Sequence, residues 1–149
     1  MIQKVTNTRG FTLIEVLLSV VLIAFITGVS VPIYRSYLVK NNLDTATMIF
    51  VQSLRRAQGL SQAGEGDTTW GVNIETGLIT VFKGASYAAR DTTYDETFTI
   101  ADSIGISGVQ EIVFSKMYGE PQTTGSVTLS SDMGHSKTIT INGKGFIDY

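Results

Sequence analysis

The chain contains no cysteine, two prolines and one histidine among its 149 residues. Without cysteine there is no disulfide, no thiolate metal site and no cysteine nucleophile, so an exported form must be held together by packing and strand pairing alone. A net charge of −2 gives no reason to expect a general nucleic-acid-binding protein. The length allows one domain of moderate size in addition to an anchor.

Charge is also nearly absent from a long stretch near the N-terminus. The apolar segment Phe11–Ile33 contains one ionisable residue, Glu15. As a helix this segment is about 35 Å long, enough to cross the hydrocarbon core of a bilayer. Because Lys4 and Arg9 precede it without a neighbouring acid, we expect the N-terminus to stay in the cytoplasm and the remainder to be exported.

Three interpretations of this segment are open. A cleaved secretory signal needs a small-residue site, which residues 28–30 offer, but Glu15 would interrupt its apolar region and Pro32 would follow the cut closely. A plain signal anchor holding a periplasmic binding domain gives Glu15 no role. A carboxylate in a membrane helix costs about 2.5–3.5 kcal/mol on insertion scales, so a partner is expected. A cut after Gly10 would supply one, because the new amine of Phe11 can pair with Glu15 of a neighbouring molecule.

The sequence RGFTLIEV (Arg9–Val16) resembles the processing site of type IV prepilins and type II secretion pseudopilins. The resemblance implies that a membrane aspartyl peptidase, the prepilin peptidase, cuts after Gly10, that Phe11 is N-methylated, and that Glu15 is the assembly carboxylate. It also implies other pilin or pseudopilin subunits and an inner-membrane assembly platform as partners. The expected location is the cytoplasmic membrane, with a single pass, and then a periplasmic or extracellular filament.

Beyond Ile33 the sequence becomes amphipathic. Spacings of three and four residues place one apolar stripe on a single helix face: Leu43, Ala46, Phe50, Leu54 and Ala57. Met48, Ile49 and Val51 widen the apolar surface, which corresponds either to a broad core face or to contacts with neighbouring subunits.

This helix is expected to end near Gly59, with Gly64 as a further stop signal. Gly28 and Pro32 predict a kink near Pro32, since proline lacks the backbone donor and clashes with the preceding turn. Pro32 also lies where many pilins have a helix-kinking proline. The aromatic residues Tyr34, Tyr37 and Phe50 are predicted to be packing anchors between neighbouring helices.

After Gly66 the period of the apolar residues changes to two, which predicts strands. The expected strands are 69–74, 78–82, 97–101, 111–114, 126–129, 138–141 and 145–147. Glu75-Thr76-Gly77 and Asn142-Gly143 are turn signals, and residues 83–94, which have no clear period, are predicted to wrap a sheet edge. Because no crossover helices are evident, the sheets should be antiparallel.

The predicted fold class is therefore α+β, with one long N-terminal helix, kinked near Pro32, packed on one or two antiparallel sheets. The resemblance to the prepilins implies that this is a pilin fold. The expected divisions are a leader (1–10), a membrane and assembly segment (11–33), an amphipathic helix (34–62) and a β head (63–149). The tryptophan hairpin, the stretch AARDTTYDETF and the C-terminal ITINGKGFI resemble the H-subunit branch of the pseudopilins and its pilus counterparts. That resemblance implies a minor subunit, although a major subunit stays open because Glu15 is present.

The sequence does not assemble a catalytic or metal site. His135 lies in a polar loop without a marked nucleophile, and a solvated turn residue is the simpler interpretation. The acids of residues 91–102 lack the spacing and glycine turn of a calcium loop and are expected to be solvated or to pair with Arg90. We expect no enzymatic activity, no metal and no cofactor.

DNA uptake is an alternative function, because some minor pilins bind DNA. It requires a basic, aromatic patch on the filament tip. Lys137, Lys144, Phe146 and Tyr149 are the candidates, and Asp148 dilutes their charge.

Overall fold

The computed structural model describes residues 10–149, with the side chains of residues 29–32 left out. The chain divides into two compact units, with the boundary after Tyr37. Apart from Gly10, the predicted leader with Lys4 and Arg9 lies outside the described residues.

One long helix, α1, runs from Leu13 to Ala63 and confirms the predicted N-terminal helix. It is the one described helix that is long and apolar enough to cross a membrane. The helix passes Gly59 and continues to Ala63, one residue beyond the predicted bound of 62. It ends at the second predicted stop signal, Gly64, which adopts a left-handed backbone with φ 65°. Residues 28–33 are helical, and the kink predicted from Gly28 and Pro32 stays a prediction.

Two four-stranded antiparallel sheets follow, which confirms the predicted α+β class. The first sheet has the order β3-β2-β1-β5, from β1 (Trp70–Glu75), β2 (Leu78–Lys83), β3 (Asp91–Thr99) and β5 (Glu111–Phe114). The second has the order β4-β6-β7-β8, from β4 (Gly105–Gly108), β6 (Gly125–Ser130), β7 (Ser136–Ile141) and β8 (Ile147–Asp148). A short 3-10 helix, η1 (Glu65–Asp67), joins α1 to β1.

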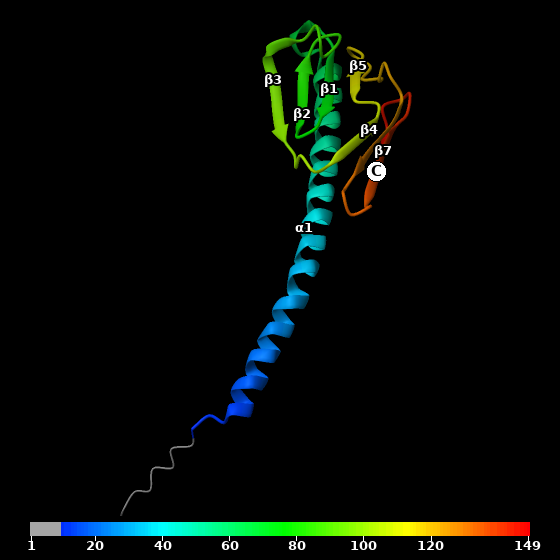
Figure 1. Ribbon diagram of the computed structural model, residues 1–149. Helices are drawn as coiled ribbons and strands as arrows, with labels where there is room; N and C mark the ends of the chain where they lie inside the picture. Colours follow the sequence, from blue (N-terminus) through cyan, green and yellow to red (C-terminus); the bar gives the residue numbers. More distant parts are fainter. Residues whose placement is uncertain (1–9) are drawn as a thin grey trace, which may run out of the picture. The chain divides into compact units, whose positions relative to one another are not determined.

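The core lies between the C-terminal half of α1 and both sheets, whose strands gather around that half of the helix (Figure 1). All five residues of the predicted helix stripe are at most 2% exposed: Leu43, Ala46, Phe50, Leu54 and Ala57. The first sheet contributes side chains such as Val72, Ile74 and Phe114, and the second contributes Val127, Leu129, Ile139 and Ile141. Ion pairs also join α1 to both sheets, Arg56 to Glu96 of β3 and Asp44 to Lys137 of β7.

The prediction that Phe50 packs against neighbouring helices is wrong. Its side chain is fully buried in the core of its own head, so it has no surface left for a neighbour. Val51 is likewise buried, Ile49 is partly buried against the core, and Met48 is 61% exposed. The widened apolar surface of this helix is therefore mainly a broad core face.

The predicted β1–β2 hairpin is confirmed, with Glu75 opposite Leu78 and Gly77 at φ 80° in the turn. The prediction for residues 83–94 is wrong in two respects, since β3 already begins at Asp91 and the preceding loop does not wrap an edge. Tyr87 packs on Phe82 of β2, and its N–H donates to Glu111 Oε1 of β5 at 2.8 Å. Because β1 separates β2 from β5, this loop lies across a face of the sheet.

The sequence did not predict β4, which pairs with β6. The Asn142 turn is present in a wider form than the predicted Asn-Gly pair. Asn142 Oδ1 accepts hydrogen bonds from the N–H groups of Lys144 and Phe146, and the glycine with positive φ is Gly145 at 77° rather than Gly143.

Candidate assembly site and head surfaces

The N-terminal end of α1 holds the residues predicted to be processed and to assemble. Thr12 precedes the first helical residue, and its side-chain oxygen accepts a hydrogen bond from the Glu15 N–H at 3.3 Å. Thr12 thus occupies the N-cap position and Glu15 the N3 position, a helix-start signal that is present in the sequence but was not predicted. The helix start is fixed two residues after Phe11.

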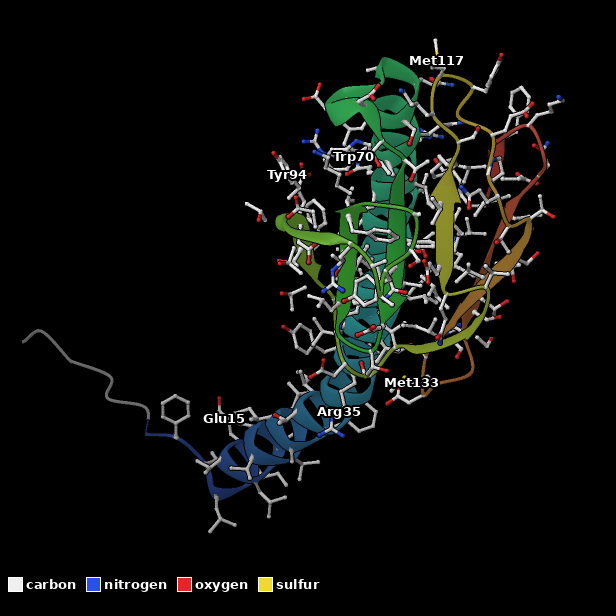
Figure 2. The ribbon with its side chains drawn as sticks, turned by 90° about the horizontal axis from the view of Figure 1, so that it is seen from above. Glu15, Arg35, Trp70, Tyr94, Met117 and Met133 are labelled. Carbon is white, nitrogen blue, oxygen red and sulfur yellow. The ribbon has the colours of Figure 1, made fainter. Side chains whose placement is uncertain are left out.

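Glu15 lies in the first turn of α1, where the positive end of the helix dipole favours a carboxylate. Its side chain is exposed, and the described part of the chain shows no ion pair to it. Phe11, which cleavage after Gly10 would make the N-terminal residue, is 84% exposed. Figure 2 shows Glu15 projecting from the helix surface.

Every described side chain of residues 11–28 and 33–37 is exposed, including a continuous apolar surface from Leu13 to Ile26. Such a surface is far larger than a soluble protein leaves in contact with water, so it requires lipid or other apolar helices around it. Tyr34 and Tyr37 are 63% and 67% exposed and, unlike Phe50, are free of the head core. Their predicted role in packing against neighbours stays a prediction.

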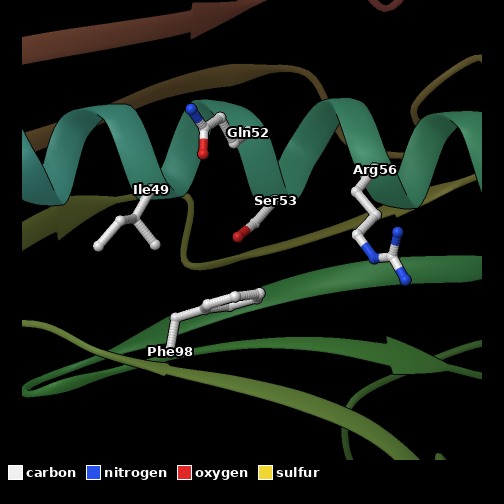
Figure 3. A pocket seen from close by; sticks show the side chains of 5 residues that line it. All are labelled: Ile49, Gln52, Ser53, Arg56 and Phe98. Atoms are coloured by element: carbon white, nitrogen blue, oxygen red, sulfur yellow. The ribbon is translucent and has the colours of Figure 1, made fainter.

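A shallow groove lies between α1 and β3 in the head (Figure 3). It is lined by Ile49, Gln52, Ser53, Arg56 and Phe98, with an accessible volume of about 150 Å³. The Arg56 guanidinium makes two hydrogen bonds to the Glu96 carboxylate, at 2.5 and 2.6 Å, and this contact raises the pKa of Arg56. Its charge is therefore already matched, and the groove offers no anion site.

Among the other polar candidates of the head, Arg90 is paired with a carboxylate in a similar way. Arg90 donates to Asp95 at 2.8 Å, as the sequence predicted, and this hydrogen bond raises the pKa of Arg90. His135 is exposed in the turn just before β7, and its backbone N–H donates to Ser131 Oγ. Within residues 10–149 as described, no group of three or more potential metal ligands occurs.

The basic residues considered for DNA binding are also paired. Lys137 lies 3.5 Å from Asp44, and Lys144 lies 2.8 Å from Glu120. The Glu120 carboxylate raises the pKa of Lys144 through a hydrogen bond and its charge. Because each lysine faces a carboxylate of its own chain, the head does not present these charges as an open basic patch.

The N-terminal end of α1 falls within a match to a known family of sequences. A family model of the prokaryotic N-terminal methylation motif matches residues 6–31, which include Gly10, Phe11 and Glu15. The chain carries the type IV pilin and pseudopilin signature. In this chain the signature is followed by the long helix and the β-rich head. Searches of curated proteins and of solved structures gave no match, so the resemblance of the head to the H-subunit branch stays a prediction.

Proposed function

We propose that this pilin-like chain is the precursor of a filament subunit, of a type IV pilus or of a type II secretion pseudopilus, and that it is a minor subunit. Prepilin peptidase cuts it after Gly10, and the mature chain polymerises through the first half of α1. The observation that carries the proposal is the methylation motif over residues 6–31, joined to a helix whose apolar surface has no cover of its own. The role is structural rather than enzymatic.

The proposed assembly step depends on Glu15. Before assembly, its carboxylate lies in a membrane helix at a cost of about 2.5–3.5 kcal/mol. Cleavage creates an amine at Phe11, which in its own chain faces the positive end of the helix dipole. Pairing between Glu15 of one subunit and the amine of its neighbour relieves both charges and fixes the register of the two helices.

Lipid and a bundle of apolar helices are similar environments, so transfer of the helix from one to the other has little hydrophobic driving force. The ion pair and side-chain packing must then specify the register, and an assembly platform with its motor supplies the work. Before assembly the chain is expected in the cytoplasmic membrane with its head exported.

Mass spectrometry of the mature N-terminus tests the processing step. The expected peptide begins at Phe11 and carries one methyl group on its amine. A chain that retains Met1, or one that begins near Val31, would overturn the proposal in favour of an anchored domain or a secretory signal.

Glu15→Gln tests the assembly step, because it keeps the size of the side chain and removes its charge. We expect normal membrane insertion and loss of incorporation into filaments, measured in sheared-filament and membrane fractions. Ser19→Ala is the matched control: Ser19 is exposed one turn later, and its hydroxyl donates to the Glu15 carbonyl without carrying charge. Equal incorporation of the Glu15→Gln variant and the control would contradict the pairing.

A further inference from the structure

Asn142 is the one asparagine of the chain that is followed by glycine, and both residues are exposed in the turn between β7 and β8. In an Asn-Gly pair the glycine nitrogen can attack the side-chain amide of the asparagine, because no Cβ crowds its approach. Both reacting groups are free: within the described part of the chain, neither the Gly143 N–H nor Asn142 Nδ2 makes a hydrogen bond. The turn therefore holds a nucleophile, an amide and water in one place.

The other asparagines that the structure describes do not meet these conditions. Asn73 is 8% exposed, its Nδ2 donates to a carboxylate at 2.8 Å, and the N–H of the next residue, Ile74, donates to the Gln110 carbonyl at 2.9 Å. Asn41 and Asn42 are exposed, but they lie in α1, where the N–H of the next residue belongs to the hydrogen bonds of the helix. Exposure alone therefore does not make an asparagine reactive.

Four hydrogen bonds fix the conformation of Asn142 in the closed turn. Its Oδ1 accepts from the N–H groups of Lys144 at 2.9 Å and Phe146 at 3.0 Å. Its N–H donates to the Phe146 carbonyl at 3.1 Å, and its carbonyl accepts from the Gly145 N–H at 2.9 Å. Closure of a ring onto the next nitrogen rotates both the side chain and the backbone of Asn142. These bonds must therefore open before the reaction can occur.

The turn lies where local opening costs little. The strand β8 has two residues, stands at the edge of its sheet and joins β7 through two residue pairs. Short elements of this kind open without unfolding of the whole domain. From α1, Gln58 Nε2 donates to the Gly145 carbonyl at 3.2 Å and so holds the turn closed. The frequency of opening should follow the strength of this contact.

We propose that Asn142 is a site of spontaneous deamidation and that opening of the turn between β7 and β8 sets its rate. In the open turn the Gly143 nitrogen gives its proton to water and bonds to the Asn142 Cγ. The bond between Cγ and Nδ2 breaks, and Nδ2 takes up a proton and leaves as ammonia. Water then opens the succinimide, at Cγ to give aspartate or at the backbone carbonyl to give isoaspartate. The net reaction consumes water and releases ammonia, so it needs no oxidant and no further reactant.

The product makes the opening irreversible. In isoaspartate the main chain runs through the former side chain, so it is longer and the acceptor of the Lys144 and Phe146 N–H groups is displaced. Either product also adds a negative charge to a chain whose net charge is −2. The modified fraction therefore increases with the time that the turn has spent open. This does not rest on the proposed function, because the turn belongs to the head alone.

Incubation of the full-length chain in detergent and mildly alkaline buffer tests the site. Trypsin releases residues 138–144, in which Asn142 is the one asparagine, and chromatography with mass spectrometry separates the amide, aspartate and isoaspartate forms. We expect both acids to accumulate in this peptide, while Asn42 and Asn73 keep their amides. A denatured sample sets the length of the incubation. A folded sample that keeps the Asn142 amide while the denatured one converts would overturn the proposal.

Gly143→Ala is the matched control for the chemistry. A Cβ at this position meets Thr124 Cγ2 at 3.9 Å, an ordinary contact, so the fold should accept it, but the methyl group crowds the attacking nitrogen. We expect loss of the conversion over the same period. Conversion at an unchanged rate would exclude ring closure by the Gly143 nitrogen.

Gln58→Ala tests the control by turn opening. The loss of its hydrogen bond to Gly145 should make conversion about two- to tenfold faster. Gly64→Ala is the control, because it strains the end of α1 at a site where a Cβ meets no atom within 4 Å. We expect it to leave the rate unchanged. An unchanged rate in Gln58→Ala would refute the control by turn opening. Acceleration of both variants in proportion to their loss of stability would refute it too, since the reaction would then occur in the unfolded chain.

Discussion

Replacement of Gln58 by alanine tests whether this one side chain holds together the loop after β5 and the loop between β7 and β8. The substitution removes two hydrogen bonds, to the carbonyls of Gly119 and Gly145, both of which belong to buried residues. Each such bond contributes about 0.5–1.5 kcal/mol, so we expect the free energy of unfolding of the head to fall by about 1–3 kcal/mol. Alanine is a better helix former than glutamine, so helix propensity does not explain a loss.

The matched control is Gln62→Ala, one turn later on the same helix. Gln62 also donates to one of these loops, at the Tyr118 carbonyl, but the bond is 3.4 Å long and exposed. We expect an effect below about 0.5 kcal/mol.

Urea unfolding of the mature chain in detergent measures both variants. The single tryptophan, Trp70, is 4% exposed in the head core and reports on the head alone. Equal urea midpoints for the two variants would refute the stabilising role of Gln58. A midpoint of the Gln58→Ala variant equal to that of the unchanged chain would refute it as well.

Three further results are expected in the same assay. Phe50→Ala should lower the free energy of unfolding by about 3–5 kcal/mol, because it empties a fully buried site, whereas the exposed Met48→Ala should change it by less than about 0.5 kcal/mol. Gly64→Ala should cost about 1 kcal/mol, because Gly64 has φ 65° at the helix end. Lys116 holds the pKa of Asp67 below its ordinary value, so this stabilisation is present above the ordinary value and is lost as the pH falls through the lowered one. Asp67→Asn should remove that part of the acid dependence of the unfolding midpoint.

Much of the fold could be predicted from local pattern. The stripe from Leu43 to Ala57 has helical spacing, and the β1–β2 hairpin has alternating residues around a glycine turn. Gly59 does not end the helix because Ala57 and Ser61 on both sides of it are buried by packing, and the later stop signal Gly64 does. The strand β4 contains glycine at both ends and becomes a strand through its pairing with β6, which no local pattern shows.

The candidate site divides in the same way. Gly10, Phe11 and Glu15 lie close together in the sequence, and Thr12, which caps the helix, lies between them. The hydrogen bonds of Gln58, by contrast, go to Gly119 and Gly145, which lie 61 and 87 positions away in the chain, so only the folded head brings these residues together. The sequence predicted Phe146 and Tyr149 as parts of a candidate basic patch, whereas Lys144 beside them is paired with Glu120, which lies 24 positions away.

The two halves of α1 differ in what stabilises them. After Leu43 the helix is part of the head core, so it cannot unfold without the sheets that it packs against. Between Phe11 and Tyr37 the described side chains have no such cover, and a helix of this kind gains its stability from its surroundings. In the proposed function, the first half therefore leaves the bilayer only when other apolar helices replace the lipid. Folding of the head and assembly of the helix are then separate events, which is why Phe50 variants should reduce the amount of folded subunit and Glu15 variants should reduce only its incorporation.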